Sequence, residues 1–477
     1  MLFNSFDFLI FLILVFILYW FVFKNQLKQQ NILVLISSYV FYGWWDYRFL
    51  SLILFSTLLD YLVGHFLGKT IQPKKRKLLL WVSLLFNLGL LGFFKYYNFF
   101  IESWVSSWES VGVEMHVSTL QIILPVGISF YTFQTLSYTI DVYKNKIKPT
   151  DSFIEFASFV AFFPQLVAGP IERASHLLPQ FSRNRVFDYE KAVSGVQLFI
   201  WGFFKKVVIA DSCAIYVNEI FGKYEQMNSL TLIVGVFLFA FQIYGDFSGY
   251  SDMAIGISRL FGFDLMNNFK YPYFAKNIAE FWRRWHISLT TWFRDYIYFP
   301  LGGSHGSKIN QIRNIFIVFL ISGVWHGANW TFVFWGFLNA LFFIPIIILT
   351  SDSKKSIETI VKSHQTKVKM FFSMILTFSI TCIGWIFFRS VTITDAFGYL
   401  QRIVDFDSFS VQYLSIERYS LEPLILIMFF IAIEWMNQAY EHPFIGKFVW
   451  LKTWIVILLI VLFGVYSNAL DFIYFQF

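Results

Sequence analysis

The chain has 477 residues, of which 57% are hydrophobic, 22% aromatic and only 14% charged, with a formal net charge of +7. This composition excludes an ordinary soluble domain and predicts an all-α polytopic membrane protein. No polar stretch is long enough to fold separately, so we expect one transmembrane domain over residues 1–477. The basic residues fall mostly between apolar segments, where they indicate topology and contacts with anionic membrane lipids, not nucleic-acid binding.

The first half of the chain alternates apolar segments with charged connections. Residues 6–23 lack a basic leader and a small-residue cleavage site, so we expect a retained span and not a signal peptide. Further apolar segments lie near residues 31–45, 49–67, 78–98 and 120–143. The connections after the first, third and fifth segments are basic, whereas residues 102–119 carry three Glu and no basic residue. The alternation predicts an extracytoplasmic N-terminus.

The second half continues in the same manner but contains broken segments. Residues 152–169 end in a proline- and glycine-rich sequence, which favours a re-entrant or broken segment over a clean span. The connection at 351–369 holds five lysines and is predicted to be cytoplasmic. Later apolar segments lie near residues 192–213, 230–262, 315–324, 331–350, 370–388, 421–438 and 453–470. In total we expect about 11–13 membrane segments, some of them re-entrant.

A polar insertion interrupts the apolar segment at 230–262. It contains Asp246, Ser248 and Asp252. A buried carboxylate must be paired, hydrogen-bonded or protonated, because an isolated charge is costly in an apolar interior. Two interpretations follow: a hydrogen-bonded contact between helices, or a site where Asp246 and Ser248 contact a substrate.

The stretch from residue 279 to residue 330 carries the most informative pattern. At helical spacing, one stripe collects the apolar residues Trp282, Trp285, Leu289, Trp292, Phe293 and Tyr296. His286 lies at the edge of this stripe, with Arg283 just beyond it and Arg284 facing away. This predicts an amphipathic helix at an interface or along a wet cavity. A later apolar run ends in Trp325-His326-Gly327. Either histidine could simply be a hydrogen-bonded packing residue.

The sequence lacks the motifs of several enzyme classes. There is no H-E-x-x-H zinc motif, no G-x-S-x-G elbow, and no histidine with Asp five positions later. Cys213 and Cys382 lie in apolar runs and indicate neither a disulfide nor a metal site. A neutral histidine can still take a proton from an alcohol that attacks an activated acyl group, and nearby arginines could receive donor phosphates.

Two motifs together resemble the membrane-bound O-acyltransferase (MBOAT) family: Trp282-Arg283-Arg284-Trp285-His286-Ile287-Ser288-Leu289 and, about forty residues later, Trp325-His326-Gly327. The bacterial alginate O-acetyltransferase branch is the most similar, and residues 168–173, 242–252, 387–389 and 472–477 also resemble it. The resemblance implies a helical fold around a central tunnel, with His326 catalytic. Other branches carry Asn or Asp where His286 stands, so its role stays open.

We therefore expect a membrane acyltransferase that passes an acetyl or similar short acyl group from a cytoplasmic thioester, such as acetyl-CoA, toward an extracytoplasmic polysaccharide. His326 would be the general base and His286 would assist or orient. The donor passage would be shaped by Trp282, Trp285 and either Arg283 or Arg284, and Trp325 would also belong to the substrate-binding residues. No bound cofactor or metal is expected, and the partner would be an extracytoplasmic acetyltransferase of the SGNH-hydrolase-like type or the polysaccharide itself.

Two alternatives stay open. A D-alanyl transferase of the teichoic acid type, fed by a carrier protein, would use the same residues. A transporter or flippase would also contain intramembrane charges and broken helices.

Overall fold

The structure is a computed structural model that describes residues 1–115, 117–350, 367–412, 422–466 and 472–473. All regular structure in these ranges is helical, with no strand among them, which confirms the all-α prediction. The helices are α1 (Phe6–Ile17), α2 (Leu27–Asp46), α3 (Leu50–Lys69), α4 (Pro73–Leu91), α5 (Tyr97–Glu109), α6 (Ile128–Tyr143), α7 (Phe153–Ala161), α8 (Ala174–Phe181), α9 (Tyr189–Phe204), α10 (Asp211–Gly222), α11 (Ser229–Leu260), α12 (Ile278–Arg284), α13 (Ile287–Phe293), α14 (Lys308–His326), α15 (Trp330–Thr350), α17 (Lys367–Arg389), α18 (Ile393–Asp405), α19 (Glu422–Met436) and α20 (Val449–Phe463). Short segments with other helical hydrogen bonding join several of them, among them η4 (Lys205–Ala210), η5 (Tyr224–Gln226) and η7 (Arg294–Tyr298).

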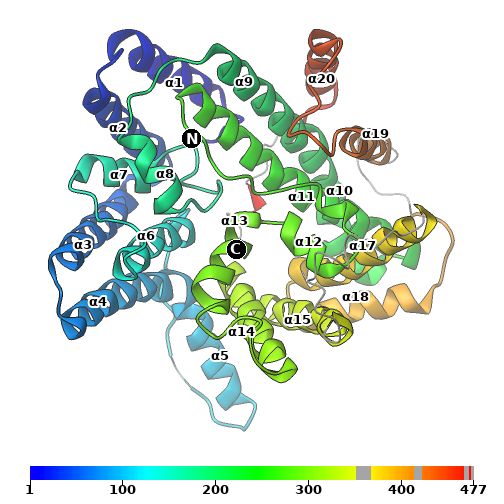
Figure 1. The fold of residues 1–477 in the computed structure, drawn as a ribbon. Coiled ribbons are helices and arrows are strands. Elements are labelled where there is room, and N and C mark those ends of the chain that lie inside the picture. The colour runs from blue at the N-terminus through cyan, green and yellow to red at the C-terminus, as the bar shows by residue number, and fades with distance from the viewer. Residues whose placement is uncertain (116, 351–366, 413–421, 467–471, 474–477) are drawn as a thin grey trace. The chain divides into compact units, whose positions relative to one another are not determined.

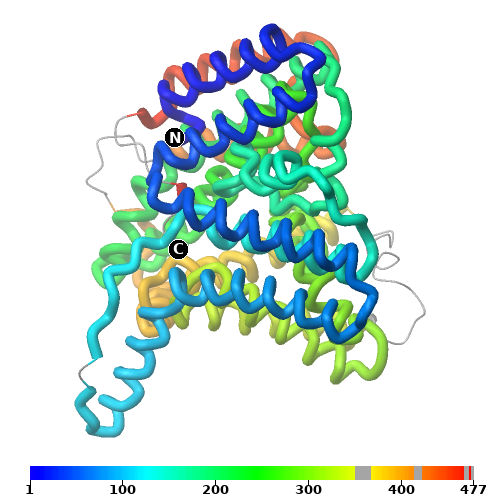
Figure 2. The backbone as a smooth tube through the Cα atoms, turned by 90° about the vertical axis from the view of Figure 1, so that its left-hand side faces the viewer, coloured from blue at the N-terminus to red at the C-terminus, as the bar shows by residue number. Residues whose placement is uncertain are grey.

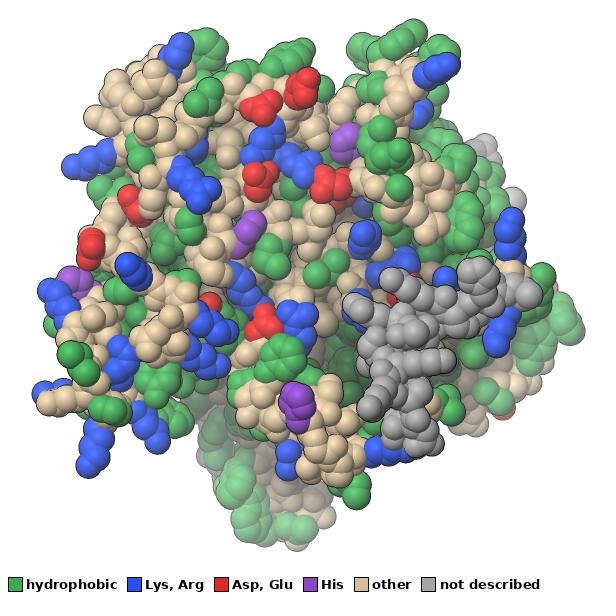
Figure 3. Space-filling view, in the orientation of Figure 1, with side chains coloured by type: hydrophobic (Ala, Val, Ile, Leu, Met, Phe, Trp, Pro, Cys, Tyr) green, Lys and Arg blue, Asp and Glu red, His purple; other side chains and the backbone are tan. Residues whose placement is uncertain are grey.

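Five helical stretches of the described chain are long and apolar enough to cross a membrane, so the protein is a multi-pass membrane protein. They are Leu27–Lys69, Pro73–Glu109, Ser229–Leu260, Trp330–Leu349 and Lys367–Arg389. The first stretch contains two helices, α2 and α3, which are separated by the extended backbone of Asp46. Many large apolar side chains stay exposed on these helices, and Figure 3 shows such side chains (green) across the face it presents. The expected total of 11–13 segments, which counts shorter and broken ones, stays a prediction.

The chain divides into two compact units, residues 1–199 with 250–266 and residues 200–249 with 267–477. In the first unit, α3 and α4 lie side by side (blue in Figure 2) and α6 packs against both. A buried carboxylate links the three helices: Asp60 of α3 accepts hydrogen bonds from Ser83 and Asn87 of α4 and from Thr139 of α6. Such interhelical hydrogen bonds stabilise helix pairs where no water competes for them.

Two predicted segments of the first unit can be compared directly with the structure. The break predicted within residues 152–169 is confirmed, because α7 ends at Ala161 and residues 162–173 are not helical. The span predicted over 120–143 is too long. Its helix, α6, begins only at Ile128, after Gly127 with a φ of 77°. A Cβ at Gly127 would lie 2.7 Å from the carbonyl oxygen of Leu166, so the chain passes too close for a side chain there.

In the second unit, α14 and α15 form a tight helical hairpin, with α17 packed against α15 (Figure 1). Glycines permit the close approach. A Cβ on Gly323 would lie 2.3 Å from the carbonyl oxygen of Phe332, and one on Gly336 would lie 2.3 Å from that of Phe319. Small residues at such crossings let two backbones touch, which increases dispersion contacts. The hairpin places His326, the last residue of α14, in the aromatic core of this unit.

Candidate active site

His326 is enclosed by aromatic rings. Its side chain is buried, with 4% of its surface exposed, and its ring packs edge-on against Trp335 and Phe388, at centroid distances of 5.0 and 5.4 Å. The residue after His326 must be a glycine, because a Cβ at position 327 would lie 2.1 Å from the ring of Phe332. The Trp-His-Gly sequence therefore ends a helix with its histidine directed into a closely packed core.

The helix predicted over residues 279–296 is not continuous. It breaks at His286, which has a φ of 45° and separates α12 from α13. A neighbouring segment pairs with the backbone at this break: the amide of Ile287 donates to the carbonyl of Asn268, and the amide of Lys270 donates to the carbonyl of Arg284, both at 2.9 Å. The left-handed conformation of His286 interrupts the helix, but these two hydrogen bonds keep the backbone groups of Arg284 and Ile287 paired.

The side chain of Asn268 determines which nitrogen of His286 carries the proton. Its Oδ1 accepts hydrogen bonds from the amide (3.3 Å) and the hydroxyl (2.9 Å) of Ser288, and it lies 3.0 Å from His286 Nδ1. The amide of Ser288 can only donate, so the atom facing it is the oxygen of Asn268, and Nδ1 must donate to the same oxygen. In neutral His286 the lone pair then lies on Nε2. Burial holds the pKa of His286 well below its usual range, which keeps the imidazole neutral.

The two histidines of the sequence motifs lie close together. Their ring centroids are 6.5 Å apart with an angle of 60° between the planes, too far for a direct hydrogen bond. Trp325 touches both rings, at 5.9 Å from His286 and 4.9 Å from His326. Phe247 of α11 packs edge-on against His286 at 4.6 Å. This arrangement places two imidazoles on one buried aromatic site, where a reacting group can lie within reach of both.

Asp246 belongs to a buried ion-pair cluster. Lys206 Nζ lies 2.6 Å from Asp246 and 2.8 Å from Asp211, and all three side chains are nearly fully buried. The other carboxylate oxygen of Asp246 accepts the amide of Ile473 at 2.6 Å, while Phe472 packs against Phe247. These contacts favour the structural interpretation of Asp246, which holds the described end of the chain beside the ring that contacts His286. Ser248 is fully buried, and its substrate contact stays a prediction.

The predicted tryptophans and arginines occupy different environments. Trp282 contacts Trp335, which also packs on His326, so it borders the site. Trp285 is 1% exposed and packs among core aromatic rings, including that of Trp385 at a centroid distance of 5.0 Å. Arg284 forms an ion pair with Glu280, whereas Arg283 is exposed. The structure thus separates two neighbouring arginines: Arg283 is exposed, whereas Arg284 is partly buried and paired.

Two residues of this region were missed by sequence reasoning. Asn268 lies in a polar connection without periodicity, so nothing in the sequence places it against His286. Lys206 did carry a signal, because Lys205 and Lys206 interrupt an apolar segment and such charges need buried partners. Among the described residues no group of three or more His, Cys, Asp or Glu side chains could hold a metal ion.

Fold and site together define a helical multi-pass membrane protein with two adjacent histidines in a buried aromatic site. Residues 147–392 match the model of the MBOAT, membrane-bound O-acyltransferase, family. The chain is 42% identical to a probable alginate O-acetylase, AlgI, of Pseudomonas syringae pv. tomato, over 76% of this chain and 68% of that protein. It is 37% identical to a peptidoglycan O-acetyltransferase of Helicobacter pylori (83% and 77%) and 26% identical to a teichoic acid D-alanyltransferase of Bacillus subtilis (55% and 68%).

This chain belongs to the membrane-bound O-acyltransferase family, and it is an acyltransferase. The resemblance read from the two histidine motifs is thereby confirmed.

Proposed function

We propose that this protein moves an acetyl or similar short acyl group from a cytoplasmic thioester, with acetyl-CoA as the donor, across a bacterial inner membrane for O-acetylation of an extracytoplasmic polysaccharide. His326 is the general base. The observation that carries the proposal is the pair of buried imidazoles, His286 and His326, at a centroid separation of 6.5 Å. A general base must be neutral and within reach of the hydroxyl whose proton it takes.

The transfer step needs one proton acceptor. The hydroxyl oxygen of the acceptor attacks the thioester carbonyl while His326 takes the hydroxyl proton. The C–O bond forms, the C–S bond breaks, and the proton passes from His326 to the departing thiolate. The aromatic rings around His326 exclude water, which strengthens the electrostatic contacts of the reacting groups and limits hydrolysis of the donor.

His286 orients the site rather than taking the first proton. Its Nδ1 is engaged with Asn268, which directs Nε2 away from that bond. A neutral Nε2 can accept a hydrogen bond from the incoming hydroxyl and align it for His326. This division of roles agrees with the Asn or Asp that other family branches carry where His286 stands, since either side chain offers an acceptor oxygen.

The named activities of the relatives support an acetyl group over D-alanine. The alginate and peptidoglycan O-acetylating relatives are 42% and 37% identical to this chain, whereas the D-alanyltransferase is 26% identical over a shorter share of it. We further infer that an extracytoplasmic partner of the SGNH-hydrolase-like type completes the transfer, because a polymer cannot reach histidines that are only 1% and 4% exposed.

The test is acyl transfer by the purified protein in proteoliposomes supplied with labelled acetyl-CoA on one side. We expect label in acetyl esters or acetate on the opposite side, abolished by His326→Ala. Label that appears only from D-alanyl carrier protein would replace the acetyl assignment. Solute uptake without acyl transfer would contradict the proposal and favour a transporter.

A further inference from the structure

One buried acid of the first unit differs from the others. Asp60 of α3 is fully buried, and no Lys, Arg or His side chain of the described residues forms an ion pair with it. Every other buried Asp or Glu in the described part of the chain lies within 3.8 Å of a basic side chain; these acids are Asp141, Glu172, Asp211, Asp246, Glu280 and Glu434. Asp60 also lies in a candidate membrane span, where an ionisable side chain is costly and indicates a functional site.

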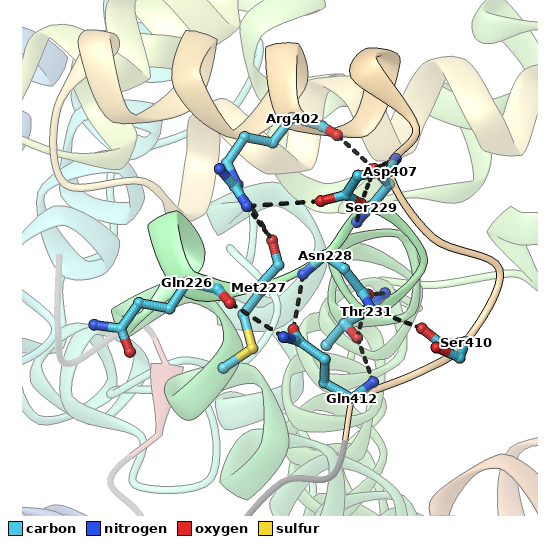
Figure 4. A network of polar contacts seen from close by, with 9 residues as sticks. All are labelled: Gln226, Met227, Asn228, Ser229, Thr231, Arg402, Asp407, Ser410 and Gln412. Carbon is cyan, nitrogen blue, oxygen red and sulfur yellow. Dashed lines mark hydrogen bonds and ion pairs between the residues drawn. The ribbon is translucent and has the colours of Figure 1, made fainter.

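The polar network of the second unit in Figure 4 shows how another acid of this protein is balanced. Asp407 accepts hydrogen bonds from the amide and the hydroxyl of Ser229, both at 2.9 Å, and it also lies 3.9 Å from the guanidinium of Arg402. Its side chain is 51% exposed, so water shares its charge. Asp60 makes comparable hydrogen bonds, but it has neither a basic partner among the described residues nor exposure to solvent.

Three hydrogen-bond donors converge on the carboxyl group of Asp60. Asn87 Nδ2 donates to the backbone carbonyl of Ser83 at 3.0 Å, which fixes the orientation of the amide, and it donates to Asp60 Oδ2 at 2.8 Å. The hydroxyls of Ser83 and Thr139 donate to the other oxygen, Oδ1, at 2.5 and 2.9 Å. These donors favour the carboxylate over the acid, whereas burial without a countercharge opposes it. A cation bound beside the carboxylate satisfies both conditions.

Neutral oxygen atoms surround this carboxylate. A hydroxyl that donates its proton to Asp60 keeps its oxygen lone pairs, which can still bind a cation. Asn87 Oδ1 accepts the hydroxyl of Ser56 at 2.8 Å and lies 3.5 Å from that of Thr135. Thr57 lies three residues before Asp60 and is therefore its neighbour on the surface of α3. The hydroxyl of Thr57 is fully buried and has no hydrogen-bond partner among the described residues.

From these observations we propose that Asp60, together with the hydroxyl and amide oxygens of α3, α4 and α6 around it, binds a monovalent metal cation such as Na⁺. Ligands that are all oxygen suit hard cations and not the transition metals that prefer nitrogen or sulfur. A single carboxylate balances one positive charge, whereas a divalent ion would leave a buried charge uncompensated. The site thus differs from a cluster of three or more His, Cys, Asp or Glu side chains, which the described residues do not form.

The bound cation holds three helices of the first unit together. Asp60 belongs to α3, Ser83 and Asn87 belong to α4, and Thr139 belongs to α6, so each helix supplies at least one oxygen. The unfolded chain does not keep these oxygens side by side, and an ion that binds only the folded chain stabilises it by mass action. The site involves neither histidine of the candidate active site, so this proposal does not rest on the proposed function.

The test compares NaCl with choline chloride at equal ionic strength and pH, with the purified full chain in detergent. We expect the Tm of the wild-type protein to rise with NaCl concentration and to level off as the site fills. Choline should have no such effect, because its cation is too large for a fully buried site. Equilibrium binding of radioactive Na⁺ to the same protein should saturate, and unlabelled NaCl should displace it.

Variants locate the ion. Asp60→Asn keeps the shape of the side chain but removes its charge, so it should abolish both the binding of Na⁺ and the dependence of the Tm on NaCl. Ser83→Ala and Thr139→Val each remove one oxygen and leave Asp60 in place. Each should raise the NaCl concentration for half-maximal stabilisation about 10-fold. The control is Glu102→Gln, an exposed carboxylate of α5 in the same unit, which should respond to NaCl as the wild type does.

Stabilisation of the wild type by Li⁺ or K⁺ as well as Na⁺ would support the same site, because the proposal concerns the charge of the ion. The proposal is overturned if NaCl and choline chloride act equally on the wild type, if Mg²⁺ replaces Na⁺ at lower concentration, or if Asp60→Asn keeps the full response. A wild-type protein that gains stability on acidification without responding to Na⁺ would also overturn it, since Asp60 would then hold a proton.

Discussion

His286 Nδ1 and Asn268 Oδ1 lie 3.0 Å apart, and the same oxygen accepts both donors of Ser288. The side chain of Asn268 thus sets the tautomer of His286 and, through Ser288, stabilises the chain next to the left-handed backbone conformation of His286. Partners that orient metal-ligating imidazoles typically change affinity or activity about 10-fold to 100-fold when they are mutated, and we expect Asn268 to act on His286 in a similar way.

Replacing the acceptor of this bond should impair catalysis. Asn268→Leu removes the oxygen that orients His286, so we expect transfer about 10-fold to 100-fold slower at saturating donor, by analogy with other second-layer partners of histidine. Asn268→Asp keeps an acceptor oxygen and should retain more activity. The neighbouring variant Asn267→Leu, on an exposed side chain, is the control. Equal rates for Asn268→Leu and the control in monodisperse protein would contradict this role.

Removing the proposed base should nearly abolish transfer. His326→Ala should lower the saturated rate by a factor of about 10² to 10⁴, the usual contribution of a general base. His326→Gln should fail too, because an amide fills the space without taking up a proton. His286→Asn should keep appreciable activity if that residue only orients. The measurement is acyl transfer by well-folded variants at equal donor occupancy, and full activity of His326→Ala would reject the mechanism.

The two arginines after Trp282 should differ in effect. Converting both to Gln should weaken donor binding more than it lowers the saturated rate, since a phosphate contact acts mainly in the ground state. Because Arg283 is exposed and Arg284 pairs with Glu280, we expect Arg283→Gln to raise the KM for the donor and Arg284→Gln to lower thermal stability. Unchanged donor affinity in the double variant would instead indicate an anchor to lipid headgroups.

The buried charge cluster should be sensitive to single replacements. Lys206→Met leaves Asp211 and Asp246 without their shared cation and should destabilise the protein by about 3–5 kcal/mol. Removing all three charges together, with Lys206→Met, Asp211→Asn and Asp246→Asn, should restore part of this loss. Thermal unfolding in detergent provides the measurement. A triple variant less stable than Lys206→Met would show that the carboxylates stabilise the fold by other contacts.

The orientation of the chain can be tested by labelling. In a background without Cys213 and Cys382, single cysteines within residues 72–76 should react with impermeant thiol reagents only from the cytoplasmic side. Those within residues 109–114 should react only from outside, as the basic and acidic connections predict. Reaction of both sets from the same side of intact membranes would overturn this topology.

Many residues of the candidate site could be predicted from the sequence, because the prediction depended only on residue types and their spacing. The pattern of two histidines at 286 and 326, their aromatic neighbours and the glycine after His326 indicated the family, and the family match over residues 147–392 confirms that membership. Composition and the lengths of the apolar runs likewise determined the helical, membrane-embedded class, since a bilayer accepts few other structures.

Tertiary structure alone decided how these residues meet. Helical periodicity treated residues 279–296 as one helix, because it counts only side chains within a segment. The break at His286 arises from the backbone of Asn268 and Lys270, which the sequence gives no means to place there. The same limit applies to Asp246, whose partners Lys206 and Ile473 lie 40 and 227 residues away along the chain. Local patterns therefore indicated which residues are candidates for the site, and only long-range packing decided their pairings, because hydrogen bonds and ion pairs depend on distance in space and not on distance along the sequence.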